Sequence, residues 1–167
     1  MMEQGQLTEN DIALWHKFRK AEMDFFAVRW ELLSSCTDKK SVIKQAFNNP
    51  SDRSSALELL LYLDIKERLP FFDDLVSLAS VNHSDIELVW KVILSLPKDF
   101  LLANIEKSAE TVLSNATQDA YVEYRCLLEL YFKIDPHLTY RLAQRALQSE
   151  DEDVREAGED YIKLLEE

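Results

Sequence analysis

Apolar residues recur in this chain at fixed distances behind an aspartate. Successive copies of the aspartate are 33, 34 and 34 residues apart, and a leucine follows each copy eleven positions later. A pair of large apolar residues also stands eight and nine positions after each aspartate. A fixed period between about 20 and 50 residues is typical of stacked helical repeats. The aspartates are Asp52, Asp85, Asp119 and Asp153, and the leucines are Leu63, Leu96, Leu130 and Leu164.

Each copy is long enough for two helices. In three copies, apolar residues at helical spacing also lie ahead of the aspartate, over residues 69–79, 102–113 and 138–147. The chain has only two glycines and four prolines, which disfavours hairpins and glycine-rich phosphate loops. Two antiparallel helices of about 12 to 17 residues fit this period. The pattern therefore predicts an all-α single domain over residues 1–167, with helix pairs over 38–63, 64–96, 97–130 and 131–165.

Polar residues mark where several of these helices begin. Thr8 followed by Asp11 has the spacing of a capping box, and predicts a helix over residues 8–34. Ser84 with Glu87 has the same spacing in the second repeat, and Thr117 is expected to cap the corresponding helix of the third. The apolar residues of the 8–34 helix form two adjoining stripes, which need a covering surface. We expect this helix to cap the first repeat, because its balanced charges disfavour the alternative of an amphipathic membrane or partner helix.

The last repeat resembles a known family. The segment DEDVREAGEDYIKLL is similar to the second helix of a HEAT repeat, in which an aspartate, a Val-Arg pair, a small residue and spaced aliphatics recur. This resemblance implies a right-handed α-α solenoid of about four HEAT-like helix pairs, whose second helices line a concave face. The matching residues in this chain are Asp153, Val154, Arg155, Ala157, Ile162 and Leu164.

A candidate partner-binding surface follows from that arrangement. Positions two, six and ten after each aspartate are four residues apart, so they share one side of a second helix. Tyrosine and arginine on a rigid exposed surface are common anchors of protein interfaces. A solvated face with a few tyrosines is the simpler interpretation. The predicted partner-binding residues are Glu58, Tyr62, Glu87, Lys91, Tyr121, Arg125, Glu129, Arg155, Glu159 and Lys163.

The final repeat also differs from the middle ones at the third, fifth and seventh positions after the repeat aspartate. These positions are Leu88, Trp90, Val92 and Val122, Tyr124, Cys126 in the middle repeats, and Glu156, Gly158, Asp160 in the last. A repeat array needs a polar outer face at its end. We therefore expect Glu156, Gly158 and Asp160 to form a solvent-facing side of the terminal helix.

Charge is unevenly divided along the chain. Residues 1–49 carry 7 basic and 7 acidic side chains, whereas residues 50–167 carry 12 basic and 24 acidic ones, which gives the whole net charge of −12. An acidic surface repels nucleic-acid phosphates and attracts basic proteins. Direct nucleic-acid binding is therefore disfavoured, although the acidity is equally consistent with a purely solubilising role.

No constellation of residues indicates catalysis or metal binding. His16, His83 and His137 are isolated in sequence, and none belongs to a metal-ligand pair. His83 and His137 stand beside expected helix starts, where a loop or capping role suffices. Cys36 and Cys126 have no CxxC partner and are expected to be reduced, buried thiols. We expect no catalytic residues, no metal and no cofactor.

These features favour a non-enzymatic protein-binding module. The chain carries neither a signal sequence nor a membrane span, so a cytoplasmic protein that is monomeric without its partner is expected. A small acidic helical-repeat protein resembles the immunity and antitoxin proteins that neutralise basic nuclease toxins. The alternatives are an adaptor or assembly factor, and a lyase-like helical-repeat enzyme or small-ligand carrier.

Overall fold

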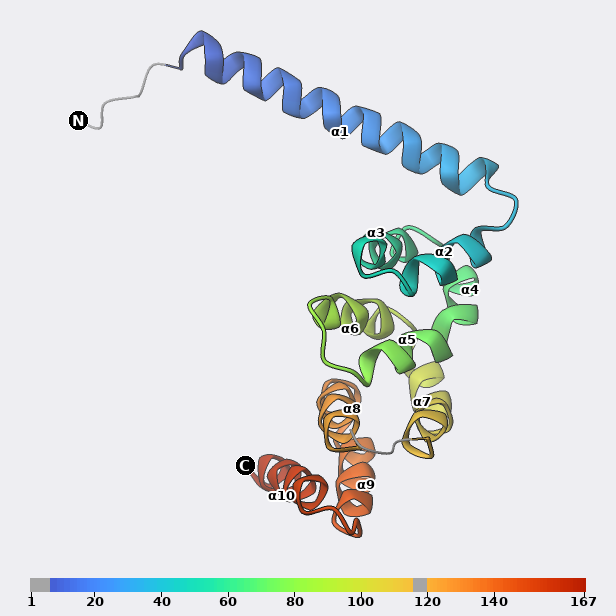
Figure 1. Cartoon of the computed structure of the whole chain (residues 1–167), viewed down its shortest axis with the longest axis vertical. Helices are drawn as coiled ribbons and strands as arrows, with labels where there is room; N and C mark the ends of the chain where they lie inside the picture. Colours follow the sequence, from blue (N-terminus) through green and yellow to red (C-terminus); the bar gives the residue numbers. More distant parts are fainter. Residues whose placement is uncertain (1–6, 116–119) are drawn as a thin grey trace, which may run out of the picture. The chain divides into compact units, whose positions relative to one another are not determined.

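The computed structural model describes residues 7–115 and 120–167, and the regular structure in those ranges is entirely helical (Figure 1). The chain divides into two compact units, Met1–Ile43 and Lys44–Glu167. Asp119 of the repeat frame lies outside the described residues. The helices are α1 (Glu9–Ser35), α2 (Lys39–Phe47), α3 (Pro50–Leu60), α4 (Ile65–Arg68), the 3-10 helix η1 (Leu69–Phe71), α5 (Phe72–Ala79), α6 (Ile86–Leu94), α7 (Lys98–Leu113), α8 (Ala120–Ile134), α9 (Pro136–Ala146) and α10 (Glu152–Glu166).

Helix α1 begins at the capping box that the sequence predicts. The Asp11 amide donates to Thr8 Oγ1 at 3.2 Å, and the Thr8 amide donates to Asp11 Oδ2 at 2.9 Å. None of the residues of α1 is buried, and Trp15 and Trp30 are 59% and 72% exposed. The role of α1 as a cap on the first repeat stays a prediction.

Within the second unit, several helices pack on a neighbour in the chain and also on helices further along. Helix α5 contacts α6 and α7, α7 contacts α8, and α9 contacts both α8 and α10. Helices α3, α6, α8 and α10 also contact one another in that order (Figure 1). These are the helices that the sequence predicts as the second members of the four repeats.

The recurring leucines supply part of the core. Leu63, Leu96 and Leu130 are buried, as the frame predicts. Leu164, at the equivalent position of α10, is 47% exposed. The apolar pairs beside these leucines also contribute, with Leu60, Ile93, Leu127 and Leu128 fully buried. The period therefore identifies which side of α3, α6 and α8 faces inward.

Polar contacts also follow the period. In the described part of the chain, four side-chain pairs that join helices of successive repeats are separated by 35 residues, one more than the usual spacing of the aspartates. Corresponding helices of successive repeats thus contact each other through residues at nearly the same position of the repeat. The pairs are Asp73 with Ser108, Glu106 with Arg141, Glu110 with Arg145, and Arg125 with Asp160.

The expected polar face of α10 is not present. Glu156 is exposed, but Gly158 is buried, and Asp160 is half-buried beside Arg125. The prediction was wrong because a step of two residues turns a helix by about 200°, so the three positions do not share a face. Gly158 lies instead where α10 meets α9, and a Cβ atom there would be 2.8 Å from the Ala143 carbonyl oxygen.

The predicted capping box at Ser84 is also wrong. Helix α6 begins at Ile86 with Asp85 as its N-cap, and no side chain caps it. His83 organises this turn, because its Nδ1 accepts a hydrogen bond from the Asp85 amide at 3.1 Å and its Nε2 lies 3.1 Å from the Leu78 carbonyl oxygen. The expected loop role of His83 is thus confirmed. Thr117, a further expected cap, lies outside the described residues.

The buried leucines give a direct test of the repeat frame. Leu130→Ala is expected to lower the free energy of unfolding by about 2 to 5 kcal/mol, because it removes fully buried methyl groups and leaves a cavity. Leu164→Ala makes the same change at an equivalent but half-exposed position, and should cost under about 1 kcal/mol. Urea denaturation measures both values. Equal losses would contradict the assigned frame.

The close approach of α9 and α10 gives a second test. Alanine normally stabilises a helix relative to glycine by about 1 kcal/mol. At Gly158 the added methyl group would meet backbone atoms of Ala143 and Leu147, so Gly158→Ala should destabilise the protein by about 1 to 3 kcal/mol. Glu156→Ala, at an exposed position of the same helix, is the control and should change stability by less than about 0.5 kcal/mol. Increased stability of Gly158→Ala would show that the helices lie further apart.

Candidate partner-binding site

The ten predicted partner-binding residues all belong to the second helices or follow them directly. Most are exposed, as expected for an interaction surface. Arg125, Glu129 and Arg155 are half-buried. Arg155 donates hydrogen bonds to the Ser149 and Glu150 carbonyl oxygens at 2.9 and 2.8 Å, so its guanidinium group holds the turn before α10. The exposed members are Glu58, Tyr62, Glu87, Lys91, Tyr121, Glu159 and Lys163.

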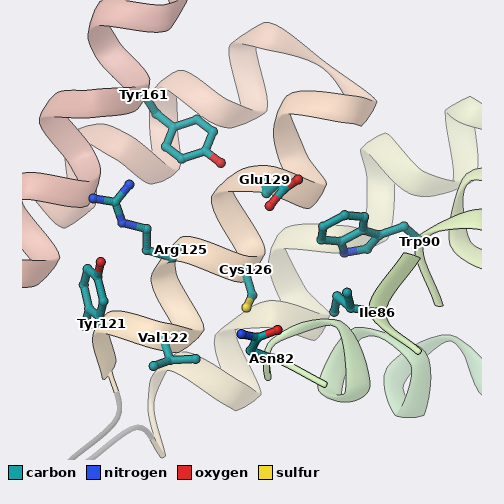
Figure 2. A pocket seen from close by; sticks show the side chains of 9 residues that line it. All are labelled: Asn82, Ile86, Trp90, Tyr121, Val122, Arg125, Cys126, Glu129 and Tyr161. Carbon is teal, nitrogen blue, oxygen red and sulfur yellow. The ribbon is translucent and has the colours of Figure 1, made fainter. Parts of the chain in front are cut away.

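Five of these residues line two adjoining cavities on α6 and α8. We call the first the Tyr161 cavity; its volume is about 400 Å³ (Figure 2). The second, the Lys91 cavity, is more open and has a volume of about 550 Å³. Trp90 and Glu129 line both. The Tyr161 cavity is lined by Asn82, Ile86, Trp90, Tyr121, Val122, Arg125, Cys126, Glu129 and Tyr161, and the Lys91 cavity by Glu87, Trp90, Lys91, Leu94, Ser95, Glu129 and Lys133.

Helical spacing explains how these side chains meet. Ile86 and Trp90 are four residues apart on α6, and Tyr121, Arg125 and Glu129 are four apart on α8, so each set lies on one side of its helix. Tyr161 comes from α10, on the other side of α8. Figure 2 shows the indole of Trp90 across the cavity from the side chains of Arg125, Tyr121 and Tyr161. The other five predicted residues line neither cavity: Glu58, Tyr62, Arg155, Glu159 and Lys163.

Arg125 is held in place by two neighbours. Its Nη2 donates to Asp160 Oδ2 at 2.7 Å, and its guanidinium carbon lies 5.3 Å from the centre of the Tyr121 ring. Burial lowers the pKa of Arg125, but interactions with Asp160 and Tyr121 outweigh burial and raise it overall. Its positive charge is therefore compensated within the protein, and the side chain forms a fixed wall of the cavity.

Trp90 separates the two cavities. It is only 9% exposed, and Lys133 Nζ lies 4.8 Å from the centre of its ring. Its indole Nε1 is buried and has no hydrogen-bond acceptor within the described structure. A buried donor without an acceptor is costly, by about 1 to 3 kcal/mol. This nitrogen is therefore an unsatisfied polar atom beside the cavities, with almost no accessible surface for an external oxygen atom to reach.

Glu129 places its negative charge between the two cavities. Burial and then the Glu129 charge raise the pKa of the Cys126 thiol. The same two causes, burial first, raise the pKa of Tyr161 to about 12. Lys133 Nζ lies 3.7 Å from Glu129 Oε1, one helical turn away. Glu129 thus acts on cavity residues from α8 and α10 alike.

Several residues of the site were not predicted as partner-binding, among them Trp90, Asp160 and Tyr161. The frame could have indicated Tyr161, because it stands eight positions after Asp153, where the other repeats have the buried aliphatics Leu60, Ile93 and Leu127. An aromatic residue with a polar tip at a core position indicates a partly solvated site. Trp90 was assigned to the apolar face of α6, which is correct for its burial. Its position between the two cavities depends on how α8 packs against α6, and no pattern in the sequence predicts it.

The described residues also show what is present for metal ligation, for thiol chemistry and for membrane insertion. In residues 7–115 and 120–167, no three residues among His, Cys, Asp and Glu are grouped so that they could hold a metal ion. Cys36 and Cys126 are free thiols and are half-buried, less covered than expected. None of the described helices is both long enough and apolar enough to cross a membrane.

Comparisons with protein-family models, with curated proteins and with solved structures gave no significant match to this chain. The resemblance to HEAT repeats therefore depends on the residues of the chain itself.

The position of Glu129 can be tested through Cys126. Glu129→Gln removes a negative charge that opposes thiolate formation, so alkylation of Cys126 at neutral pH should accelerate by roughly twofold to tenfold. The rate with iodoacetamide is measured in a Cys36→Ser background, which leaves Cys126 as the single thiol. Glu87→Gln is the control, because Glu87 lines only the Lys91 cavity. Equal rates in the parent and in Glu129→Gln would place the carboxylate away from the thiol.

Proposed function

We propose that this chain is a non-enzymatic protein-binding module built as a right-handed stack of HEAT-like helix pairs. The ordered contacts among α3, α6, α8 and α10 support the stack, as do the side-chain pairs separated by 35 residues. In such a stack, the second helices present a continuous surface to a partner.

The observation that carries this proposal is the cluster of aromatic and charged side chains around the two cavities. Trp90, Tyr121, Arg125 and Tyr161 come from three different helices and line one cavity. Tryptophan, tyrosine and arginine are the residue types that dominate binding energy at protein interfaces, particularly when they line pockets. Because the Arg125 guanidinium is fixed by Asp160, the surface is ordered before a partner arrives, which reduces the entropic cost of binding.

Charge indicates the kind of partner. The residues from 50 onward carry the entire net charge of −12, and the cavities lie within this acidic part. A basic protein would approach such a surface faster than a neutral one, by a factor of about 10 to 1,000 at low salt. The most concrete form of the proposal is an immunity or antitoxin protein that neutralises a basic nuclease toxin. An adaptor or assembly factor is the alternative with the same surface chemistry.

Capture of partners with matched variants tests this proposal. Immobilised protein is incubated with lysate of the source cells, and bound proteins are identified by mass spectrometry. A Lys91→Ala, Tyr121→Ala variant changes two exposed side chains at the cavities, and should lose at least about 90% of a specific basic partner because interface anchors carry most binding energy. A Lys107→Ala, Tyr140→Ala variant changes the same residue types at exposed positions of α7 and α9, and should retain it.

The captured partner then decides between the forms of the proposal. Its association rate should fall steeply from low to physiological salt, while its dissociation rate changes less. If it is a nuclease, stoichiometric addition of this protein should abolish its activity. Retention of the partner by the cavity variant, or an association rate independent of salt, would contradict the proposed surface.

A further inference from the structure

We propose that the Tyr161 cavity receives one arginine side chain of the partner, with the guanidinium group at Glu129 and against the aromatic rings of the cavity wall. This inference rests on the proposed function and specifies which chemical group the surface recognises. It follows from two properties of the cavity: its aromatic walls and its incompletely paired carboxylate.

The aromatic walls are arranged to accept cations. The chain already places a cation against each of two rings, with Lys133 Nζ 4.8 Å from the centre of Trp90 and the Arg125 guanidinium 5.3 Å from the centre of Tyr121. Tyr161 offers a third ring, half-buried on the side that α10 contributes. Cations bind over the faces of such rings because the ring quadrupole is negative there. A planar guanidinium group also stacks on them, which an ammonium group does not.

The carboxylates of the site differ in how far they are already paired. Asp160 binds Arg125 at 2.7 Å, a normal charge-assisted hydrogen bond. Glu129 has its nearest cation, Lys133, at 3.7 Å, which exceeds hydrogen-bond distance, and its side chain is 47% exposed. A guanidinium group that entered the cavity could therefore donate two hydrogen bonds to Glu129 without displacing the Arg125 and Asp160 pair.

Trp90 contributes to this site as a wall and not as a hydrogen-bond donor. The ring is nine-tenths buried and lines the cavity, and its Nε1 has no acceptor in the described structure and almost no accessible surface. In Figure 2 the nitrogen edge of the ring is turned towards the side of the cavity where Ile86 lies. A ligand in the cavity therefore meets the ring of Trp90 and not its N–H group.

The electrostatic field around the cavity also favours an arginine side chain. The carboxylates and cations nearest the cavity, Asp160 and Glu129 against Arg125 and Lys133, balance one another. The segment from 149 to 167, which supplies Tyr161, carries 9 acidic and 2 basic side chains, a charge of −7. The long-range attraction of a basic residue therefore comes from this segment, and its final position comes from Glu129 and Trp90.

The test uses Trp90 as its own reporter. The chain has three tryptophans, and Trp15 and Trp30 are exposed residues of α1, so a Trp15→Phe, Trp30→Phe protein keeps Trp90 as the single tryptophan. The probe is a capped glycine peptide with one central arginine. Its binding is followed by Trp90 fluorescence and by the single indole N–H resonance in a nitrogen-proton correlation spectrum. The matched probe replaces arginine with citrulline, which has the same shape and no charge.

The expected results are specific to each group. The arginine peptide should move both signals saturably, and the citrulline and lysine peptides should bind at least about tenfold more weakly, the effect of one charge-assisted contact. Glu129→Gln should weaken arginine binding at least about fivefold, whereas Glu87→Gln should change it less than about twofold. Circular dichroism and the thermal midpoint establish that each variant remains folded.

Several results would overturn this inference: equal binding of the arginine and citrulline peptides, equal binding of the lysine peptide, no loss in Glu129→Gln, or an indole resonance that does not move. These outcomes are separable from failure of the proposed function. A partner captured through the cavities without arginine binding would leave the protein-binding role intact. Arginine binding without any captured partner would support the cavity chemistry and contradict the role.

Discussion

The structure of the second unit depends on the rotation of each second helix about its own axis. Burial of Leu60 in α3, Ile93 in α6 and Leu130 in α8 fixes this rotation, because a helix that turned these side chains outward would expose them to water. Once the rotation is fixed, residues about half a turn away must face outward. Glu87 and Lys91 on α6, and Tyr121 on α8, are in this position and are exposed. The same helix rotation therefore determines which residues form the core and which form the candidate site.

A second feature of the site is that the Arg125 guanidinium is already paired through Nη2, although its Nε is buried without an acceptor in the described structure. Arg125 uses Asp160 from the following helix, so the pair fixes α8 to α10 as well as forming a cavity wall. Such a pair at a partly exposed position contributes at most about 1 kcal/mol to stability. Its larger effect is on order, because it holds the guanidinium group and the neighbouring Tyr121 ring in one arrangement. Recognition is then left to the groups that remain incompletely paired.

The sequence alone predicts the helical class, the start of α1 and the inward side of α3, α6 and α8, because each depends on local spacing. It fails where two helices must be considered together. Gly158 appears polar by its position in the frame, but it is buried because α9 approaches closely. Tyr161 and Trp90 meet only through α8, which lies between the helices that carry them. Half of the predicted site residues line the cavities because they lie on α6 and α8. The other half belong to α3 and α10 or follow α3, and they do not line the cavities.

The ion pairs between α7 and α9 have a mechanical consequence. Glu106 and Glu110 are one turn apart on α7, and they bind Arg141 and Arg145, one turn apart on α9. Each pair is exposed and contributes little alone. If one helix slid by a turn, about 5.4 Å, only one pair could reform and two opposite charges would be left without partners. The two helices therefore have one preferred axial register, so a load applied along them would meet a discrete step rather than gradual slippage.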